Sequence, residues 1–350
     1  MTKKHFVVLL TAALWLHAGA PSVNSIESGG ALVRQAMLAL NAGASRDDAA
    51  TGEAQCRRAL ELAPADSADA AAAHNVLGAI LETQGRFVDA RVELETALAA
   101  RERLFGSSNP LLAETLDKLG LVYRQQGHLE KAEALYRRAI EILRQRPAVE
   151  LGAAFNNLGN DLAAQGRVEE AEGALRQAIG VWEQVLGSEH PNIAAALSNL
   201  STLERIRHHY SKAERLLEQA LEIDRKMLPV GSVRIGLDLN NAGTLFAARK
   251  HYADAEGALR DSLSILRNSL PADHPEIGRV SVNLGMVLRM ERKTEEGDQR
   301  YWDGIEILTR AWGPQDARLL GLLRPYTEDV AAEPAGVNMG VAHRAGMVRF

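Results

Sequence analysis

The sequence predicts an all-α fold, a solenoid of antiparallel helix pairs stacked side by side. Three observations predict it. A Leu-Gly pair recurs along the chain, mostly every 42 residues, and repeats of this length are typical of solenoids. Two further columns of small residues keep the same register. Aromatic residues make up only 5% of the chain, which suits stacked helices better than a β-sandwich.

Small residues define the contacts expected inside each repeat unit. The glycine column is Gly78, Gly120, Gly159, Ser201, Gly243 and Gly285. The later columns are Ala90, Ala132, Ala171, Ala213, Ala255 and Gly297, then Ala97, Ala139, Ala178, Ala220, Ser262 and Gly304. Helices that pack roughly 8–10 Å apart have no room for large side chains at their closest contact. Because Gly297 and Gly304 replace alanine, the last unit is expected to pack more loosely.

Each unit reads as two helices joined by a turn. In the third unit the second helix is expected from about Val168 to Leu186. Turn glycines such as Gly166 fit a helix end that needs a positive φ. Prolines in linkers such as GSEHP suit the first position of the next helix, and the preceding His190 and His274 are expected to be capping residues.

The N-terminus predicts export. A positive start at Lys3 and Lys4 precedes an apolar run that is too short to span a bilayer. Small residues follow, and cleavage is expected after Ala18 or Ala20. This is typical of a Sec-type signal peptide, so the mature protein is expected to be periplasmic or secreted, without a membrane span.

The expected organisation of the chain follows from these segments. It comprises a signal peptide at 1–20, a degenerate N-terminal helix pair at 27–64, the repeat array at 68–316, a capping helix at 317–330 and a disordered tail at 331–350.

The stretch LGLVYRQQGHLEKAEALYRRAIEI, residues 119–142, resembles the tetratricopeptide repeat. The 42-residue spacing and the linker GSEHPNIA resemble its kinesin-light-chain-like subtype. The resemblance covers about residues 68–316. It implies a right-handed superhelical solenoid of about six units plus the degenerate N-terminal unit. It also implies a non-enzymatic scaffold that binds a partner protein or an extended peptide in its concave groove.

One face of the first helices carries many asparagines, opposite the face that carries the core. An amide offers both a donor and an acceptor, so it can pair with a peptide main chain whatever its side chains. The candidate groove residues are Asn75, Asp117, Arg124, Asn156, Asn157, Asn160, Asn199, Thr202, Arg205, Asn240, Asn241, Thr244 and Asn283. The alternative is that this asparagine ladder bridges neighbouring repeats, in a structural or self-associating array of an envelope assembly.

A column of residues that can carry positive charge follows the turn glycines. Its members are Arg86, His128, Arg167, His209, His251 and Lys293. One interpretation is that they complement the dipole at helix C-termini. The other is an anion-binding edge formed by His209, Arg249, Lys250 and His251.

Other chemistry is not indicated. The net charge of −5 gives no global attraction to nucleic acid. The single cysteine, Cys56, lies in a helical pattern and is expected to be a buried apolar residue. Because no phosphate-loop, hydrolase or zinc-protease motif occurs, the sequence predicts no catalytic residue, no metal and no cofactor. It leaves open the identity of the partner and the formation of homo-oligomers.

Overall fold

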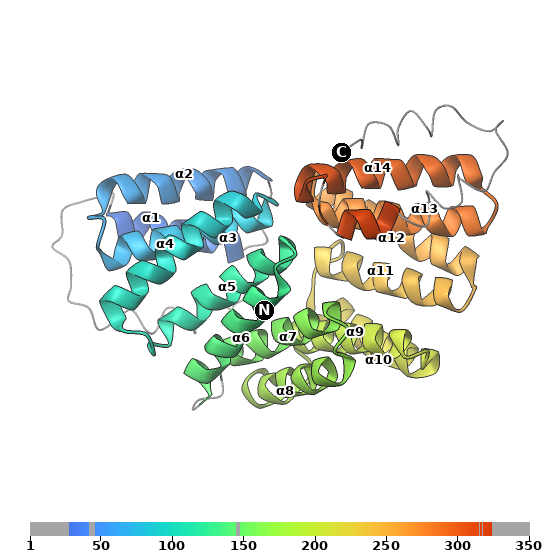
Figure 1. Ribbon diagram of the computed structural model, residues 1–350, viewed down its shortest axis with the longest axis horizontal. Helices are drawn as coiled ribbons and strands as arrows, with labels where there is room; N and C mark the ends of the chain where they lie inside the picture. Colours follow the sequence, from blue (N-terminus) through green and yellow to red (C-terminus); the bar gives the residue numbers. More distant parts are fainter. Residues whose placement is uncertain (1–27, 42–45, 145–147, 315, 317, 324–350) are drawn as a thin grey trace, which may run out of the picture.

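The computed structural model describes residues 28–41, 46–144, 148–314, 316 and 318–323 (Figure 1). The predicted signal peptide, the predicted tail and the part of the predicted capping helix beyond residue 323 lie outside these residues. The helices are α1 (Gly29–Asn41), α2 (Arg46–Leu62), α3 (Ala68–Thr83), α4 (Phe87–Phe105), α5 (Leu111–Gln125), α6 (Leu129–Leu143), α7 (Val149–Ala164), α8 (Val168–Leu186), α9 (Pro191–Ile206), α10 (Tyr210–Met227), α11 (Val233–Ala248), α12 (Tyr252–Ser269), α13 (Pro275–Met290) and α14 (Thr294–Trp312).

Consecutive helices form antiparallel pairs, α1 with α2 through α13 with α14, and each pair stacks on the next. All regular structure in the described residues is helical. The predicted fold, a right-handed superhelical solenoid of helix pairs, is confirmed. No helix in the described ranges is both long and apolar enough to cross a membrane.

The turns within the units have the predicted backbone. Gly85, Gly127 and Gly166 have φ angles of 76°, 79° and 77°, in the left-handed region that glycine enters without steric cost. In later units the same place is held by residues with a side chain. His208 and Lys250 have φ angles of 62° and 64°.

The small residues lie where helices meet. A Cβ atom added to Gly159 would lie 2.7 Å from Cγ of Leu175 and 3.2 Å from the carbonyl oxygen of Ala171. A carbon–carbon distance of 2.7 Å is a steric overlap, so a larger residue here would require the Leu175 side chain or the two helices to shift. Ala171 and Ala178 are fully buried at the same interface, as the register predicts.

The last unit packs closely, so the expectation of looser packing there is wrong. A Cβ on Gly285 of α13 would lie 2.7 Å from the carbonyl oxygen of Gly297 on α14. A Cβ on Gly297 would lie 2.9 Å from the carbonyl oxygen of Gly285. The glycines at these facing positions let the two backbones approach each other directly, so removing side chains brings the helices together instead of leaving a gap.

The array curves until its C-terminal end meets the units formed by α3 and α4 and by α5 and α6 (Figure 1). The guanidinium of Arg318 donates a hydrogen bond to the carbonyl oxygen of Gln125, the last residue of α5. The ring of Pro275, at the start of α13, lies 3.4 Å from the place a Cβ would take on Gly85. We call this junction between the two ends of the array the seam.

Candidate functional site

The first helix of each pair lies on the inner side of the curve. Neighbouring first helices touch, as α5 touches α7, α7 touches α9 and α9 touches α11. Successive second helices do not pack against one another in this way in the described part of the chain. Elements on the inside of a bend lie closer together than those on the outside, so the odd-numbered helices form the inner face.

The asparagine ladder joins neighbouring repeats along this face. An amide on one first helix donates to a side-chain oxygen on the first helix before it. Asn157 donates to Asp117 at 2.9 Å and Asn199 to Asn156 at 3.0 Å. Asn241 donates to Ser198 and Asn283 to Asn240, both at 2.9 Å. The bridging role is therefore present in the structure, whereas peptide binding by the same residues stays a prediction.

The ladder is partly withdrawn from water. Burial raises the pKa of Asp117 to about 6, and the hydrogen bonds from Asn157 act in the opposite direction. At its N-terminal end, Asn75 is buried and accepts a hydrogen bond from Thr115 at 2.9 Å. Thr115 in turn accepts one from Arg101. Such satisfied networks hold neighbouring elements in one register.

Some of the other candidate groove residues make polar interactions within the fold, and others do not. The hydroxyls of Thr202 and Thr244 donate to carbonyl oxygens of their own helices. Arg124 acts within the stack, where its charge opposes the burial that raises the pKa of Asp161 to about 6. Among the described residues, Asn160 and Arg205 make no side-chain hydrogen bond or ion pair, and both are half-buried.

The column of cations lies in the turns between the end of each first helix and the start of the second helix. Its members are the N-cap residues of the second helices, and none makes a side-chain cap bond. Each also lies two residues beyond the C-cap of the first helix, and its backbone N–H donates to a carbonyl oxygen of the last turn of that helix. The dipole interpretation therefore stays a prediction.

Carboxylates of the preceding repeat neutralise most of these turns. They follow the alanine column by one residue on the second helix. The resulting pairs are Glu53 with Arg86 at 3.0 Å, Glu133 with Arg167 at 2.8 Å, Glu172 with Arg207, Glu214 with Arg249 at 2.6 Å, and Glu256 with Lys293 at 2.5 Å. These ion pairs run from one repeat to the next along the turns.

The predicted anion edge is for the most part used by these contacts. Nδ1 of His209 lies 2.9 Å from Glu204, and His251 lies 3.9 Å from Asp254. Arg249 is bound by a carboxylate as described above. Lys250 is exposed and pairs with no carboxylate in the described residues, but it holds the left-handed turn position. Anion binding by this edge remains a prediction.

The remaining chemical groups have structural roles. Nδ1 of His190 accepts a hydrogen bond from the amide of Asn192 at 3.1 Å, and His274 caps α13 in the same way at 3.2 Å. Their predicted capping role is confirmed, and burial lowers the pKa of both imidazoles. Burial raises the pKa of the Cys56 thiol to about 12, so it stays protonated and unreactive near neutral pH. No cluster of three potential metal ligands occurs in the described ranges.

Two sets of residues were missed by the sequence reasoning. Ile206 and Met290 are exposed apolar side chains on first helices, and their place in the register could have revealed them. A pocket at the seam, described below, brings α4, α5 and α14 together. In the sequence the pocket is indicated only by Arg91, which stands where the other repeats have a carboxylate one residue after the alanine column.

Comparisons with known proteins agree with the fold. Profiles of the tetratricopeptide repeat match residues 68–145, 150–226 and 239–276. A search of curated proteins finds no match. A Rap protein complexed with competence and sporulation factor has a TM-score of 0.62 at 14% identity, over 91% of this chain and 92% of that one.

Two further solved structures are similar. A tetratricopeptide repeat protein from Parabacteroides merdae has a TM-score of 0.50 at 18% identity, over 85% of this chain and 97% of that one. BtubC (BKLC) from P. vanneervenii has a TM-score of 0.46 at 19% identity, over 74% of this chain and 96% of that one. The identities are low, so the structural likeness concerns the fold. The repeat profiles cover more than half of the chain, which therefore belongs to the tetratricopeptide repeat proteins.

Proposed function

We propose that this chain is an exported, non-enzymatic scaffold that binds an extended peptide of a partner protein across the inner face of α7, α9 and α11. Tetratricopeptide repeats suggest a protein-interaction scaffold in general. The finer proposal rests on one observation: Arg205 is partly buried and has no carboxylate partner among the described residues.

Arg205 lies on α9 and is half-buried. Burial lowers its pKa, and no carboxylate of the described residues lies within ion-pair distance. A charge that is partly removed from water without a partner costs free energy. Arg205 is therefore suited to a carboxylate that a bound partner supplies, either an acidic side chain or a C-terminus.

The surroundings of Arg205 suit the rest of a peptide. Asn160, one repeat earlier on α7, has a free amide that can donate to and accept from a main chain. Ile206 is 45% exposed, and on α13 Met286 and Met290 are 40% and 61% exposed. Flexible apolar side chains of this kind adapt to varied partners. By their place in the register these side chains lie on the inner face, which thus offers a charge on α9, an amide on α7 and apolar contacts on α9 and α13.

The similar fold of the Rap protein supports the proposal, because that structure holds a bound factor. Proteins with a fold of this shape and nearly this length can therefore form complexes. The identity of 14% carries no partner over to this chain.

The peptide proposal is tested by selecting a displayed peptide library on the full chain. The dissociation constant of an enriched peptide is then measured with wild type, with the double variant Asn160→Ala and Arg205→Ala, and with Arg176→Ala. Arg176 lies on α8, is 65% exposed and serves as the control. We expect the double variant to raise Kd at least tenfold and the control to leave it unchanged. Equal binding by all three proteins would reject the inner-face site.

Export rests on residues 1–20 and is tested separately. We expect mass spectrometry of the native protein to find a mature chain that begins at Gly19 or Pro21, in an extracytoplasmic fraction. A cytosolic chain that retains Met1 would reject export and leave the peptide site unaffected.

A further inference from the structure

The column of carboxylates that neutralises the turns is broken once inside the array. In the unit formed by α3 and α4, the position after the column alanine is Arg91. The turn at His128 in the next unit therefore has an arginine beside it, at the position where the other turns have a glutamate. A positive charge thus stands where the pattern of the array places a negative one.

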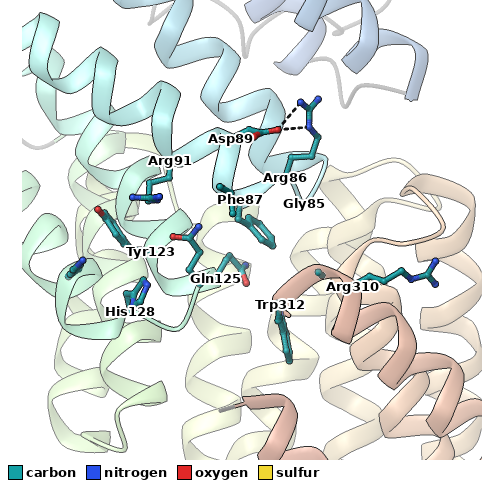
Figure 2. A pocket seen from close by; sticks show the side chains of 14 residues that line it. Gly85, Arg86, Phe87, Asp89, Arg91, Tyr123, Gln125, His128, Arg310 and Trp312 are labelled. Carbon is teal, nitrogen blue, oxygen red and sulfur yellow. Dashed lines mark hydrogen bonds and ion pairs between the residues drawn. The ribbon is translucent and has the colours of Figure 1, made fainter. Parts of the chain in front are cut away.

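A pocket of about 540 Å³ lies at this break (Figure 2). Its walls come from the start of α4, from the turn between α5 and α6, and from the end of α14. In Figure 2, Tyr123 and His128 lie on one side, and Trp312 of α14 lies on the other. The pocket therefore spans the seam between the two ends of the array.

Three cationic or ionisable side chains surround Tyr123 in this pocket. Nζ of Lys131 lies 5.2 Å from the centre of the Tyr123 ring, and the His128 ring lies 6.0 Å from it, edge to face. Arg91 also lines the pocket, and its side chain lies near Tyr123 in Figure 2.

The carboxylates near the pocket are already engaged. Asp89 binds Arg86 at 2.8 Å. Glu95 accepts a hydrogen bond from the Tyr123 hydroxyl at 2.6 Å and lies 3.5 Å from Arg91. For Lys131 and His128, no ion pair occurs among the described residues. Lys131, and His128 when it is protonated, therefore carry positive charge that no carboxylate of the described residues balances.

We propose that the seam pocket binds an oxyanion, the chemical group that a glutamate supplies to the equivalent turns of the other repeats. Lys131, His128 and Arg91 bind its charge, and the side-chain amide of Gln125 lies within the same pocket as a further donor. The N-termini of α4 and α6 border the pocket and favour an anion through their dipoles. The ligand also fills space between α14 and α5, so its binding tightens the seam.

This site is separate from the inner-face peptide site and does not depend on it. None of Arg91, His128 and Lys131 belongs to the ladder or to the inner-face residues around Arg205. Loss of one activity is therefore expected without loss of the other.

The test uses isothermal titration calorimetry on the full chain with two probes, inorganic pyrophosphate and an acetylated, amidated tetraglutamate. Binding of pyrophosphate alone identifies a phosphate-class ligand. Binding of tetraglutamate, with or without pyrophosphate, identifies peptide carboxylates as a source. Either result supports an oxyanion site, provided that Lys131→Gln weakens it at least fivefold. Failure of both probes to bind wild type would overturn the proposal.

Arg91→Glu provides the sharper variant, because it restores the carboxylate of the other repeats. We expect it to raise Kd more than tenfold, while the melting temperature without ligand is unchanged or higher. Arg176→Gln removes an exposed cation on α8, outside the pocket, and should leave binding unchanged. Wild-type affinity in Arg91→Glu, or an equal loss in Arg176→Gln, would also overturn the proposal.

Discussion

The side-chain amide of Asn283 on α13 donates a hydrogen bond of 2.9 Å to the side-chain oxygen of Asn240, which lies 43 residues earlier on α11. Asn240 is buried, so its oxygen has no ready substitute in water. The pair shows the role of the ladder within the fold. Each bridging amide joins one repeat to its neighbour, and the groups that form the bridge are then not available to bond with a peptide.

Asn283→Ala should lower the free energy of unfolding by about 1–3 kcal/mol, because it leaves a buried acceptor unsatisfied. Asn160→Ala should cost less than about 0.5 kcal/mol, because that amide has no partner in the described structure. Urea denaturation followed by circular dichroism compares the two. Equal losses would contradict the division of the ladder into bridging and free members.

Lys250→Gly should stabilise the protein. Lys250 has a φ of 64°, and the left-handed region costs a residue with a side chain roughly 1–2 kcal/mol. Glycine removes that cost, although it gives back about 0.5–1 kcal/mol through the entropy of the unfolded chain. A rise in melting temperature is therefore expected. Gly166→Ala, at a φ of 77°, should lower it, and the opposite pair of signs would refute the strain argument.

Alanine should have opposite effects at two glycines. Gly297→Ala places a Cβ 2.9 Å from the carbonyl oxygen of Gly285, so a loss of about 1–3 kcal/mol is expected from overpacking. Gly173 on α8 has nothing within 4 Å of its added Cβ, so Gly173→Ala should stabilise by about 1 kcal/mol. Thermal unfolding measures both. A neutral Gly297→Ala would mean that α13 and α14 can separate freely.

A buried pair of carboxyls predicts a dependence on pH. Burial, and then Asp238, raise the pKa of Asp224 from 3.8 to about 7, and the nearby Arg234 opposes this at 3.6 Å. An acid with a raised pKa binds its proton more tightly in the folded state. Its contribution to stability is therefore present at low pH and is lost as pH rises from about 4 through 7.

Asp224→Asn should remove that loss, because a neutral amide replaces the buried charge. The difference in melting temperature between variant and wild type should grow in favour of the variant from pH 5 to pH 8. Taking the difference cancels the effects of Asp117, Asp161, His190 and His274, which titrate in both proteins. A difference that does not change with pH would contradict the shifted pKa of Asp224.

Much of the fold could be predicted because its rules are local. The spacing of Gly159, Ala171 and Ala178 determines which surfaces of two consecutive helices can meet. The same reasoning failed for Gly297, because one glycine in isolation indicates lost packing. Its partner Gly285 lies on the facing helix, and two facing glycines permit direct backbone contact.

The site was less predictable because it depends on geometry between repeats. Asn283 bonds to Asn240 through the rotation of one unit relative to the next, which no single helix reveals. The contact of Arg318 with Gln125 depends on curvature summed over many units. The pairing of the turn cations could have been found, because the carboxylate column keeps the repeat register as clearly as the glycines do.

The most direct test of the central proposal is site-specific photocrosslinking to an enriched peptide. Benzoylphenylalanine replaces Thr202 on the inner face of α9 or, as control, Arg176 on α8, and crosslinked products are mapped by mass spectrometry. We predict a peptide adduct from position 202, reduced by Arg205→Ala, and none from position 176. An adduct from position 176 without one from position 202 would contradict binding at the inner face.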